Sequence, residues 1–290
     1  MPGTSVPGIS HEHEREKGTS LSKHTVAVLG TGKIGELVLS GLLRSGHPAS
    51  NLLVTARRPD RAAELTERYG VAVVDNATAV AKADILAVAV KPQDAGALLG
   101  EIGAQVSAEK LVVSLCAGLP TGFFGARLPE GTPVVRVMTN TPALVDQAMS
   151  AISPGPHATA EHVALAEELF TPLGATIQVP ESQQDAVTAL SGSGPAYFYL
   201  LAESMIEAGV LLGLPRQTAQ ELVVQTAFGS ASLLRDSGEH PVKLREAVTS
   251  PAGTTAAAIR ELENHGVRAA LLDALEAARD RAAEIADRAR

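Results

Sequence analysis

The sequence predicts an α/β chain in which a doubly wound parallel sheet is followed by an all-helical C-terminal domain. Between residues 25 and 179, short apolar runs alternate with amphipathic helical stretches, as in a parallel sheet covered on both faces. After Pro180 the strand signals stop and only helical patterns follow. We therefore expect a flexible tail at residues 1–23, a doubly wound domain at 24–180 and a helical domain at 181–290.

The expected strands are continuous apolar runs, and most are separated by amphipathic stretches such as 33–44, 60–69 and 94–105. The stretch 147–152 fits this alternation poorly, and its state stays open. The expected strands are residues 25–29, 52–56, 71–74, 85–90, 111–115, 134–138 and 176–179.

The second domain is expected to hold five helices. Pro195 and Pro215 stand near helix starts, and Gly213 and Gly266 fall between helical runs. Its apolar positions are mainly alanine, so each residue buries little area and the core of one chain is thin. We therefore favour a dimer over a close-packed monomer. The helices are expected at residues 196–212, 216–235, 242–248, 255–264 and 267–289.

Composition excludes several classes of protein. The 290 residues include 24 Lys and Arg against 32 Asp and Glu, a net charge of −8, and only 3% are aromatic, which argues against a nucleic-acid partner. No apolar run reaches the roughly 18 residues of a membrane span, and residues 1–23 lack the apolar region of a signal peptide. The single cysteine suits a reducing, cytoplasmic setting. His11 and His13 of the tail could catch a stray metal ion, but the other histidines show no ligand spacing, so we predict no metal site.

A glycine-rich motif directly after the first strand predicts a dinucleotide-binding loop of the Rossmann type. Gly30 permits a tight turn, Gly32 lets the backbone approach a pyrophosphate, and Gly35 lets the helix pack on the strand. The start of the helix then attracts the phosphate charge. The motif is Gly30-Thr31-Gly32-Lys33-Ile34-Gly35.

The end of the second strand favours NADPH over NADH. Proteins that bind NADH usually have an Asp or Glu at the end of this strand, but this chain has Thr55 followed by Arg57 and Arg58. A guanidinium pairs well with a 2′-phosphate, and the Thr55 hydroxyl could add a hydrogen bond. Two alternatives stay open: the arginines are solvated loop charges, or Asp60 turns back to the ribose, which would allow NADH.

Three further loops follow strands at the edge where open α/β sheets bind ligands. Each loop taken alone is more often structural than functional. Cys116 has no basic neighbour in sequence that would lower its pKa, so we interpret it as a packed thiol rather than a nucleophile. The loops are Val90-Lys91-Pro92, Cys116-Ala117-Gly118 and Met138-Thr139-Asn140-Thr141-Pro142.

Two segments of the helical domain are unusual: a Gly/Ser loop at residues 190–197, and residues 249–255, which place hydroxyls at a helix start. The second segment resembles a carboxylate site in outline, although ordinary helix capping explains it equally well. Paired carboxylates and a Ser/His/Asp set are both missing from the candidate loops. Hydride transfer to a C=N bond needs neither, because it depends mainly on positioning.

These residues resemble the pyrroline-5-carboxylate reductase family from about His24 to the end. The motifs that carry the resemblance are VAVLGTGKIG, AVKPQD, SLCAG, VVRVMTNTP, DAVTALSGSGPAYFY, GLPRQTA and EHPVKLREAVTSPAGTT. The resemblance implies reduction of the imine of 1-pyrroline-5-carboxylate by NAD(P)H to give L-proline, the last step of proline biosynthesis. It also implies a helical dimerisation domain, with rings of five dimers common in the family.

The resemblance also implies roles for individual residues. The glycine loop with Ile34 would bind the pyrophosphate, and Thr55, Arg57 and Arg58 would face the adenosine phosphate. The adenosine and nicotinamide sides of the cofactor would be lined by Asn76, Ala89, Val90, Lys91 and Pro92. Cys116, Ala117 and Gly118 would lie by the nicotinamide. Thr255 would be the catalytic residue and would hydrogen-bond the ring nitrogen of the substrate. The carboxylate of the substrate would be cradled by the backbone N–H groups of Ser250, Pro251, Ala252, Gly253, Thr254 and Thr255.

The chain departs from the family's pattern in places. The family's Ser-Pro-Gly-Gly loop is Ser-Pro-Ala-Gly here, so if position 252 needs a positive φ, alanine costs about 1 kcal/mol. Ala247 stands where some family members have Asn or Asp near the cofactor, so we assign it no role. A glutamate found in some members aligns with Gly238, one place before Glu239, so a role for Glu239 is only weakly supported. A β-hydroxyacid dehydrogenase is a second hypothesis, but residues 193–212 lack the lysine it needs. A non-enzymatic NADP-binding protein is the third, although Thr254 and Thr255 are intact.

Overall fold

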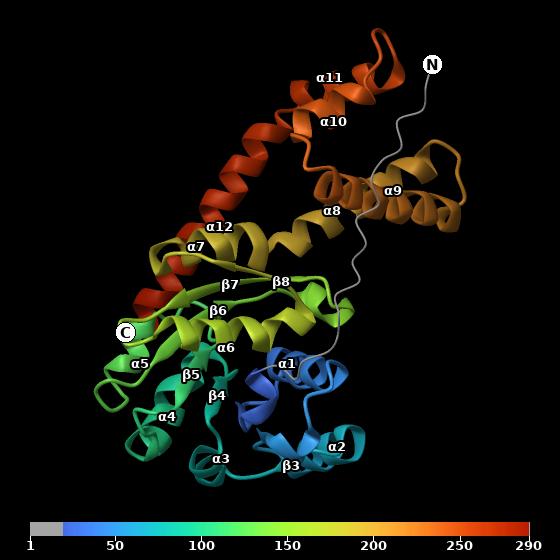
Figure 1. Cartoon of the computed structure of the whole chain (residues 1–290). Helices are drawn as coiled ribbons and strands as arrows, with labels where there is room; N and C mark the ends of the chain where they lie inside the picture. Colours follow the sequence, from blue (N-terminus) through green and yellow to red (C-terminus); the bar gives the residue numbers. More distant parts are fainter. Residues whose placement is uncertain (1–19, 290) are drawn as a thin grey trace, which may run out of the picture.

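An eight-stranded sheet lies at the centre of the N-terminal half of the molecule (Figure 1). The structure is a computed structural model and describes residues 20–289. The strands run in the order β3-β2-β1-β4-β5-β6-β7-β8, and all neighbours are parallel except β6 and β7. The strands are β1 (Val26–Leu29), β2 (Leu52–Thr55), β3 (Ala72–Val73), β4 (Ile85–Val88), β5 (Leu111–Ser114), β6 (Val134–Met138), β7 (Ala148–Pro154) and β8 (Gly174–Gln178).

Helices connect the strands and cover the sheet, and longer helices form the C-terminal part. Those of the first half are α1 (Lys33–Arg44), α2 (Pro59–Tyr69), α3 (Asn76–Lys82), α4 (Pro92–Ile102), α5 (Thr121–Gly125), α6 (Ala160–Phe170) and α7 (Gln184–Val187). A π-helical turn at Thr188–Gly192 then leads into α8 (Gly194–Leu211), α9 (Arg216–Ser237), α10 (Pro241–Ala247), α11 (Thr254–Asn264) and α12 (Val267–Ala289). Short 3-10 turns lie at Ser20–Lys23, Ala49–Asn51, Gly103–Gln105, Thr141–Val145, Thr171–Leu173 and Glu181–Gln183.

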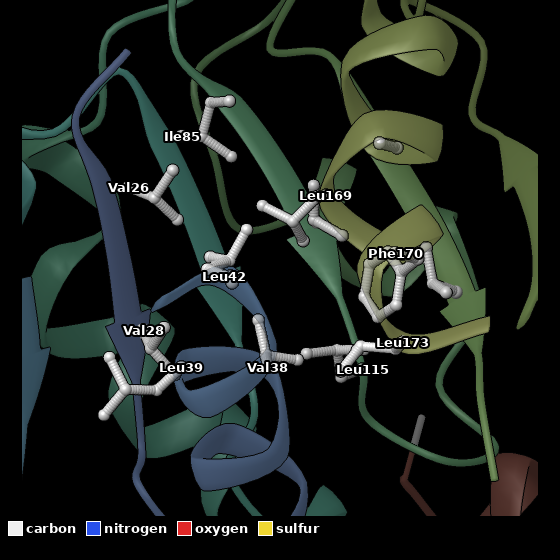
Figure 2. Close-up of a cluster of buried hydrophobic side chains, with 14 of the residues drawn as sticks. Val26, Val28, Val38, Leu39, Leu42, Ile85, Leu115, Leu169, Phe170 and Leu173 are labelled. Carbon is white, nitrogen blue, oxygen red and sulfur yellow. The ribbon is translucent and has the colours of Figure 1, made fainter. Parts of the chain in front are cut away.

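The central strands β1, β2, β4 and β5 are buried on both faces, whereas the edge strands β3 and β8 are partly exposed. This burial confirms the predicted doubly wound architecture. In β1, Val26 and Val28 belong to one apolar cluster, and Ala27 and Leu29 belong to another. Figure 2 shows the first cluster, in which α1 and α6 pack against the strands. Helices α3, α4 and α5 supply the second cluster on the opposite face. Continuous apolar strands are therefore explained by burial on both sides.

The stretch 147–152, left open above, is mostly strand β7. It pairs antiparallel with β6 and parallel with β8. Its connection to β6 is a short 3-10 turn rather than a crossover helix, which allows antiparallel pairing. The strand carries Ser150 and Ser153, which are fully buried and hydrogen-bonded to the Thr139 hydroxyl and the Val179 carbonyl. Because these serines interrupt the apolar run, the sequence pattern did not predict this strand.

The expected tail at residues 1–23 ends earlier than predicted. Residues 20–23 form a 3-10 helix in which Leu21 is 3% exposed and packs into the first apolar cluster. Its backbone N–H donates to the Glu168 carboxylate of α6 at 2.7 Å. The short segment contains one leucine only, which is too weak a pattern to predict burial. The rest of the expected tail lies outside the described residues.

The five helices predicted for the C-terminal part all form, and they leave a large apolar surface exposed. In α8 and α9, only Gly194 and Ala219 are buried. None of the helices in residues 20–289 is long and apolar enough to cross a membrane. The large exposed apolar side chains of these two helices include Phe198, Tyr199, Leu200, Leu201, Met205, Leu211, Leu222, Val224, Phe228 and Leu233.

Ala252 has a backbone φ of +58°, in the left-handed region that favours glycine. The condition stated above for a cost at position 252 is therefore met in the structure. An L-residue there costs about 1–2 kcal/mol relative to ordinary helical backbone. The chain carries this cost in the loop that precedes α11.

Replacement of Ala252 by glycine is expected to leave the melting temperature unchanged or raise it. Relief of the backbone strain offsets the greater flexibility that glycine gives to the unfolded chain, about 0.5–1 kcal/mol. The matched control is Ala258→Gly inside α11, where glycine has no compensating gain and lowers stability by about 1 kcal/mol. Thermal unfolding followed by circular dichroism compares the two variants, and equal losses of stability would contradict the strain at Ala252.

Candidate active site

The glycine motif forms the turn between β1 and α1. Gly30 has a φ of +91°, and a Cβ added there would lie 2.6 Å from Val90 Cγ1. A Cβ added at Gly35 would overlap the carbonyl oxygen of Gly30, so this glycine lets α1 pack close to the strand. Gly32 is the N-cap of α1, and the space around it is open. The loop therefore offers free backbone at a helix start, as an anion site requires.

A cavity of about 830 Å³ lies at the carboxyl ends of β1, β2 and β4. The chain reverses its winding direction at this point, because β1 lies between β2 and β4, and open α/β sheets bind ligands at such crevices. The expected cofactor residues that line the cavity are Gly30, Thr31, Gly32, Lys33, Thr55, Arg57, Arg58, Asn76, Ala89, Val90 and Lys91. Those that do not line it are Ile34, Gly35, Pro92, Cys116, Ala117 and Gly118.

Thr55 ties the second strand to the glycine loop. Its hydroxyl oxygen accepts a hydrogen bond from the Gly30 N–H at 3.1 Å, and its carbonyl accepts one from the Thr31 hydroxyl at 3.0 Å. Its side chain is buried. Thr55 lines the cavity, but both of its oxygen atoms accept hydrogen bonds from the glycine loop, so it fixes the shape of that loop.

Both arginines after β2 lie at the rim of the cavity and are ion-paired. Arg57 is 86% exposed and donates to the Asp94 carboxylate of α4 at 3.0 Å. Arg58 is also exposed and lies 3.6 Å from Asp60. Asp60 does not line the cavity. Two guanidiniums thus stand at the mouth of the cleft, each beside a carboxylate.

The structure also shows a charged network in this cleft that sequence analysis missed. Glu36 of α1 accepts hydrogen bonds from Arg61, from Arg68 at 2.9 Å and from the Tyr69 hydroxyl at 2.8 Å. Burial alone would raise the pKa of Glu36, but the hydrogen bonds and the arginine charges lower it below its ordinary value. Arg61 also reaches the Thr31 carbonyl at 3.4 Å. The network holds the glycine loop against α2, and only the position of Glu36 next to the motif could have indicated it.

Cys116 is a packed thiol, as its sequence surroundings indicate. It is 2% exposed, and its Sγ donates to the Val90 carbonyl at 3.4 Å. Burial raises the pKa of the thiol to about 12, so it stays protonated near neutral pH and is no nucleophile. Its loop, with Ala117 and Gly118, follows β5 at the same edge of the sheet as the cleft.

The loop after β6 joins the sheet to the helical part. Asn140 donates to the Ser191 carbonyl and hydroxyl, both at 3.2 Å, and accepts the Met149 N–H at 3.1 Å. A Cβ added to Gly192 would overlap Met138, so the π-helical turn lies directly on the end of the strand. The Gly/Ser loop predicted at residues 190–197 therefore has a structural contact with the sheet edge.

The expected substrate segment forms the turn between α10 and α11. The Gly253 N–H donates to the Ser250 carbonyl at 3.0 Å, and α11 begins at Thr254. No side chain caps this helix, so ordinary capping does not explain the hydroxyls. Thr255 is half-buried in the first turn. The segment thus combines unpaired backbone N–H groups with hydroxyls at the start of an 11-residue helix.

Within one chain, the substrate segment and the nucleotide cleft lie far apart. Helices α10 and α11 lie at the top of Figure 1, whereas the sheet and the helices α1 to α4 lie well below them. Helix α11 packs mainly on α12, which runs back to α7 beside the sheet. A single chain therefore presents the two parts of the expected site without bringing them together.

Each half of the chain matches a known family model. Residues 181–285 match the family model described as pyrroline-5-carboxylate reductase dimerisation, and residues 25–118 match that of NADP oxidoreductase coenzyme F420-dependent. The chain is 44% identical to the pyrroline-5-carboxylate reductase of Corynebacterium melassecola and 43% identical to that of Mycobacterium tuberculosis H37Rv. The aligned regions cover 90% of this chain in both cases, and 98% and 96% of the relatives.

Solved structures agree with these sequence relatives. The pyrroline-5-carboxylate reductase of Coxiella burnetii is 33% identical with a TM-score of 0.85, covering 90% of this chain and 98% of that one. The Plasmodium falciparum pyrroline carboxylate reductase, solved with NADP bound, is 28% identical with a TM-score of 0.83, covering 91% of this chain and 99% of that one. By sequence and by fold, the chain belongs to the pyrroline-5-carboxylate reductase family.

Proposed function

We propose that the protein reduces the C=N bond of 1-pyrroline-5-carboxylate with NADPH and gives L-proline, the last step of proline biosynthesis. The observation that carries this proposal is the pairing, in one chain of this family, of a dinucleotide cleft with an uncapped helix start that bears hydroxyls. The cleft would bind the reductant, and the helix start would bind the carboxylate of an anionic substrate.

The glycine loop fits a dinucleotide. Gly32 leaves the start of α1 open, so backbone N–H groups there can meet a pyrophosphate. Lys33 and Lys91 line the same cavity and supply positive charge. When bound, NADPH supplies the hydride. The adenosine and nicotinamide sides of the cofactor would be lined by Asn76, Ala89, Val90, Lys91 and Pro92. The loop after β5 would lie by the nicotinamide with Cys116, Ala117 and Gly118.

The phosphate assignment rests on the end of β2. The strand ends at Thr55 with no carboxylate, and Arg57 and Arg58 follow at the rim of the cleft. Arginine pairs with phosphate through two parallel hydrogen bonds, so these residues would favour NADPH over NADH. The match to an NADP oxidoreductase family model supports the same preference.

The start of α11 is the proposed substrate site. The unpaired N–H groups at Thr254 and Thr255 suit a carboxylate, helped by the helix dipole. The Thr255 hydroxyl would hydrogen-bond the ring nitrogen and orient the imine carbon toward the cofactor. Positioning of this kind supplies most of what hydride transfer needs, and the imine can bring its own proton.

The active enzyme is proposed to be a homodimer in which each substrate segment serves the partner's cleft. Two observations support this: one chain keeps the two parts apart, and α8 and α9 expose large apolar side chains that a second copy would cover. The family model matched by residues 181–285 is that of a dimerisation domain. Rings of five dimers remain a proposal from the resemblance alone. Residues 181–290 would thus be the substrate-binding and dimerisation domain, following a Rossmann domain that ends near residue 180.

The proposed compartment is the cytoplasm, where NADPH is available and thiols stay reduced. The free, buried Cys116 is consistent with that setting.

A spectrophotometric assay tests the proposal directly. Purified protein is given pyrroline-5-carboxylate with NADPH or with NADH, and the loss of reduced cofactor is followed by absorbance. We expect turnover with NADPH and formation of proline. Flat traces with both cofactors, from protein that still binds NADPH, would leave a nucleotide-binding protein without this activity.

Thr255→Ala is expected to lower turnover by about 10- to 100-fold while the dissociation constant of NADPH stays nearly unchanged, because one positioning hydrogen bond is lost far from the cofactor phosphates. The control is Thr249→Ala, whose hydroxyl is occupied by the Arg245 carbonyl. Calorimetry measures NADPH binding, and a large loss of binding in Thr255→Ala would show that the residue has another role.

The double change Arg57→Ala with Arg58→Ala is expected to weaken NADPH by about 10-fold or more and to leave NADH within about twofold, since only NADPH carries the 2′-phosphate. Calorimetric titrations with the two cofactors measure the ratio. Equal losses for both cofactors would contradict the phosphate assignment and favour solvated loop charges instead.

A further inference from the structure

An ion pair between Arg57 and Asp94 spans the mouth of the nucleotide cleft. Arg57 follows β2, and Asp94 lies in the first turn of α4, directly after β4. Because β2 and β4 flank β1, the pair crosses over the edge of the sheet that carries the glycine loop. Both residues line the cavity, and the guanidinium donates to the carboxylate at 3.0 Å.

The carboxylates of this cleft differ in what they do. Glu36 and Glu64 share Arg61, and Glu101 accepts from the Asn76 amide at 3.1 Å. Asp94 instead pairs with Arg57, a guanidinium that we assign to the cofactor phosphate. Its charge therefore bears directly on cofactor choice.

The pair itself is easily opened. Arg57 is 86% exposed and Asp94 is 32% exposed, and ion pairs in such surroundings are weak because water screens them. A 2′-phosphate can therefore displace Asp94 as the ion-pair partner of the Arg57 guanidinium. After that exchange, however, the carboxylate still lies beside a group that carries about two negative charges.

We propose that Asp94 is a specificity-determining residue that competes with the 2′-phosphate for Arg57 and so limits the preference for NADPH over NADH. The inference rests on the proposed function, since it needs the phosphate assignment. The Asp94 charge opposes the phosphate of NADPH by direct repulsion. Asp94 pairs with Arg57 beside the end of β2, so its carboxylate could accept a hydrogen bond from the neutral 2′-hydroxyl of NADH. In Rossmann folds that bind NADH, a carboxylate at the end of the second strand has this role, whereas Asp94 comes from α4.

The test replaces Asp94 by asparagine, which keeps the shape and removes the charge. Calorimetry measures binding of NADPH, NADH, adenosine 2′,5′-bisphosphate and 5′-AMP to the full chain. In Asp94→Asn, NADPH and the bisphosphate are expected to bind about three- to tenfold more tightly, whereas NADH and 5′-AMP stay equal or weaken. The gain should shrink as salt is added, because screening weakens the repulsion that was removed.

The matched control is Glu101→Gln on the same helix, which lines the same cavity but does not pair with Arg57. It is expected to leave the ratio of the NADPH and NADH dissociation constants within about twofold. In the Arg57→Ala background, Asp94→Asn should give a smaller gain for NADPH than in the wild type. Asp94→Ser serves as a second charge-removing variant, with circular dichroism to check folding.

Two results overturn the inference. If Asp94→Asn weakens NADPH, the carboxylate positions Arg57 for the phosphate instead of competing with it. If both cofactors change equally, Asp94 has no part in discrimination. Failure of the proposed function looks different, because the wild type would then bind NADPH without reducing pyrroline-5-carboxylate, or would bind neither cofactor.

Discussion

The helical half of the chain exposes more large apolar side chains than it can bury, and the proposed site follows from that constraint. Helices α8 and α9 pack against each other, yet phenylalanine, leucine and valine side chains along both remain open to solvent. Alanine-rich helices approach closely but remove little area from water in each contact. A second copy of the chain would cover this surface. In the proposed dimer, α11 of one chain serves the cleft of the other, because a single chain keeps the two parts apart.

The residues that line the nucleotide cleft, by contrast, all belong to one chain. Its shape depends on close backbone contacts at Gly30 and Gly35, where any side chain would collide with the neighbouring strand or turn. The Thr55 hydrogen bonds and the Glu36 network then fix the loop against β2 and α2. Charge is balanced closely at the rim, since each arginine after β2 already has a carboxylate partner. Cofactor choice would therefore depend on the competition between the phosphate and these carboxylates.

Sequence patterns predicted the elements of the fold well, because burial on both faces produces continuous apolar strands and because glycine and proline mark helix ends. They failed at β7, where Ser150 and Ser153 are buried but satisfied by hydrogen bonds, and at the short turn around Leu21. The motifs also predicted the glycine loop, whereas the positive φ at Ala252, raised above only as a condition, is a finding of the structure. The pairing of Arg57 with Asp94, and of Glu36 with Arg61, joins residues far apart in the chain and has no periodic signature. The distance between the cleft and the substrate segment was equally hidden, since it depends on how the helices pack.

A mixed dimer tests most directly whether the site is shared between two chains. One chain carries Thr255→Ala, and the other carries Gly32→Asp, which adds a negative charge to the pyrophosphate loop at a position with open space around it. Gly32→Asp alone should be nearly inactive, and Thr255→Ala alone should keep at most about a tenth of the wild-type turnover. If the cleft of one chain works with the α11 of the other, purified mixed dimers contain one intact site and recover about half of the wild-type turnover. Mixed dimers as inactive as the two parents would show that each site is built within a single chain and would contradict the account.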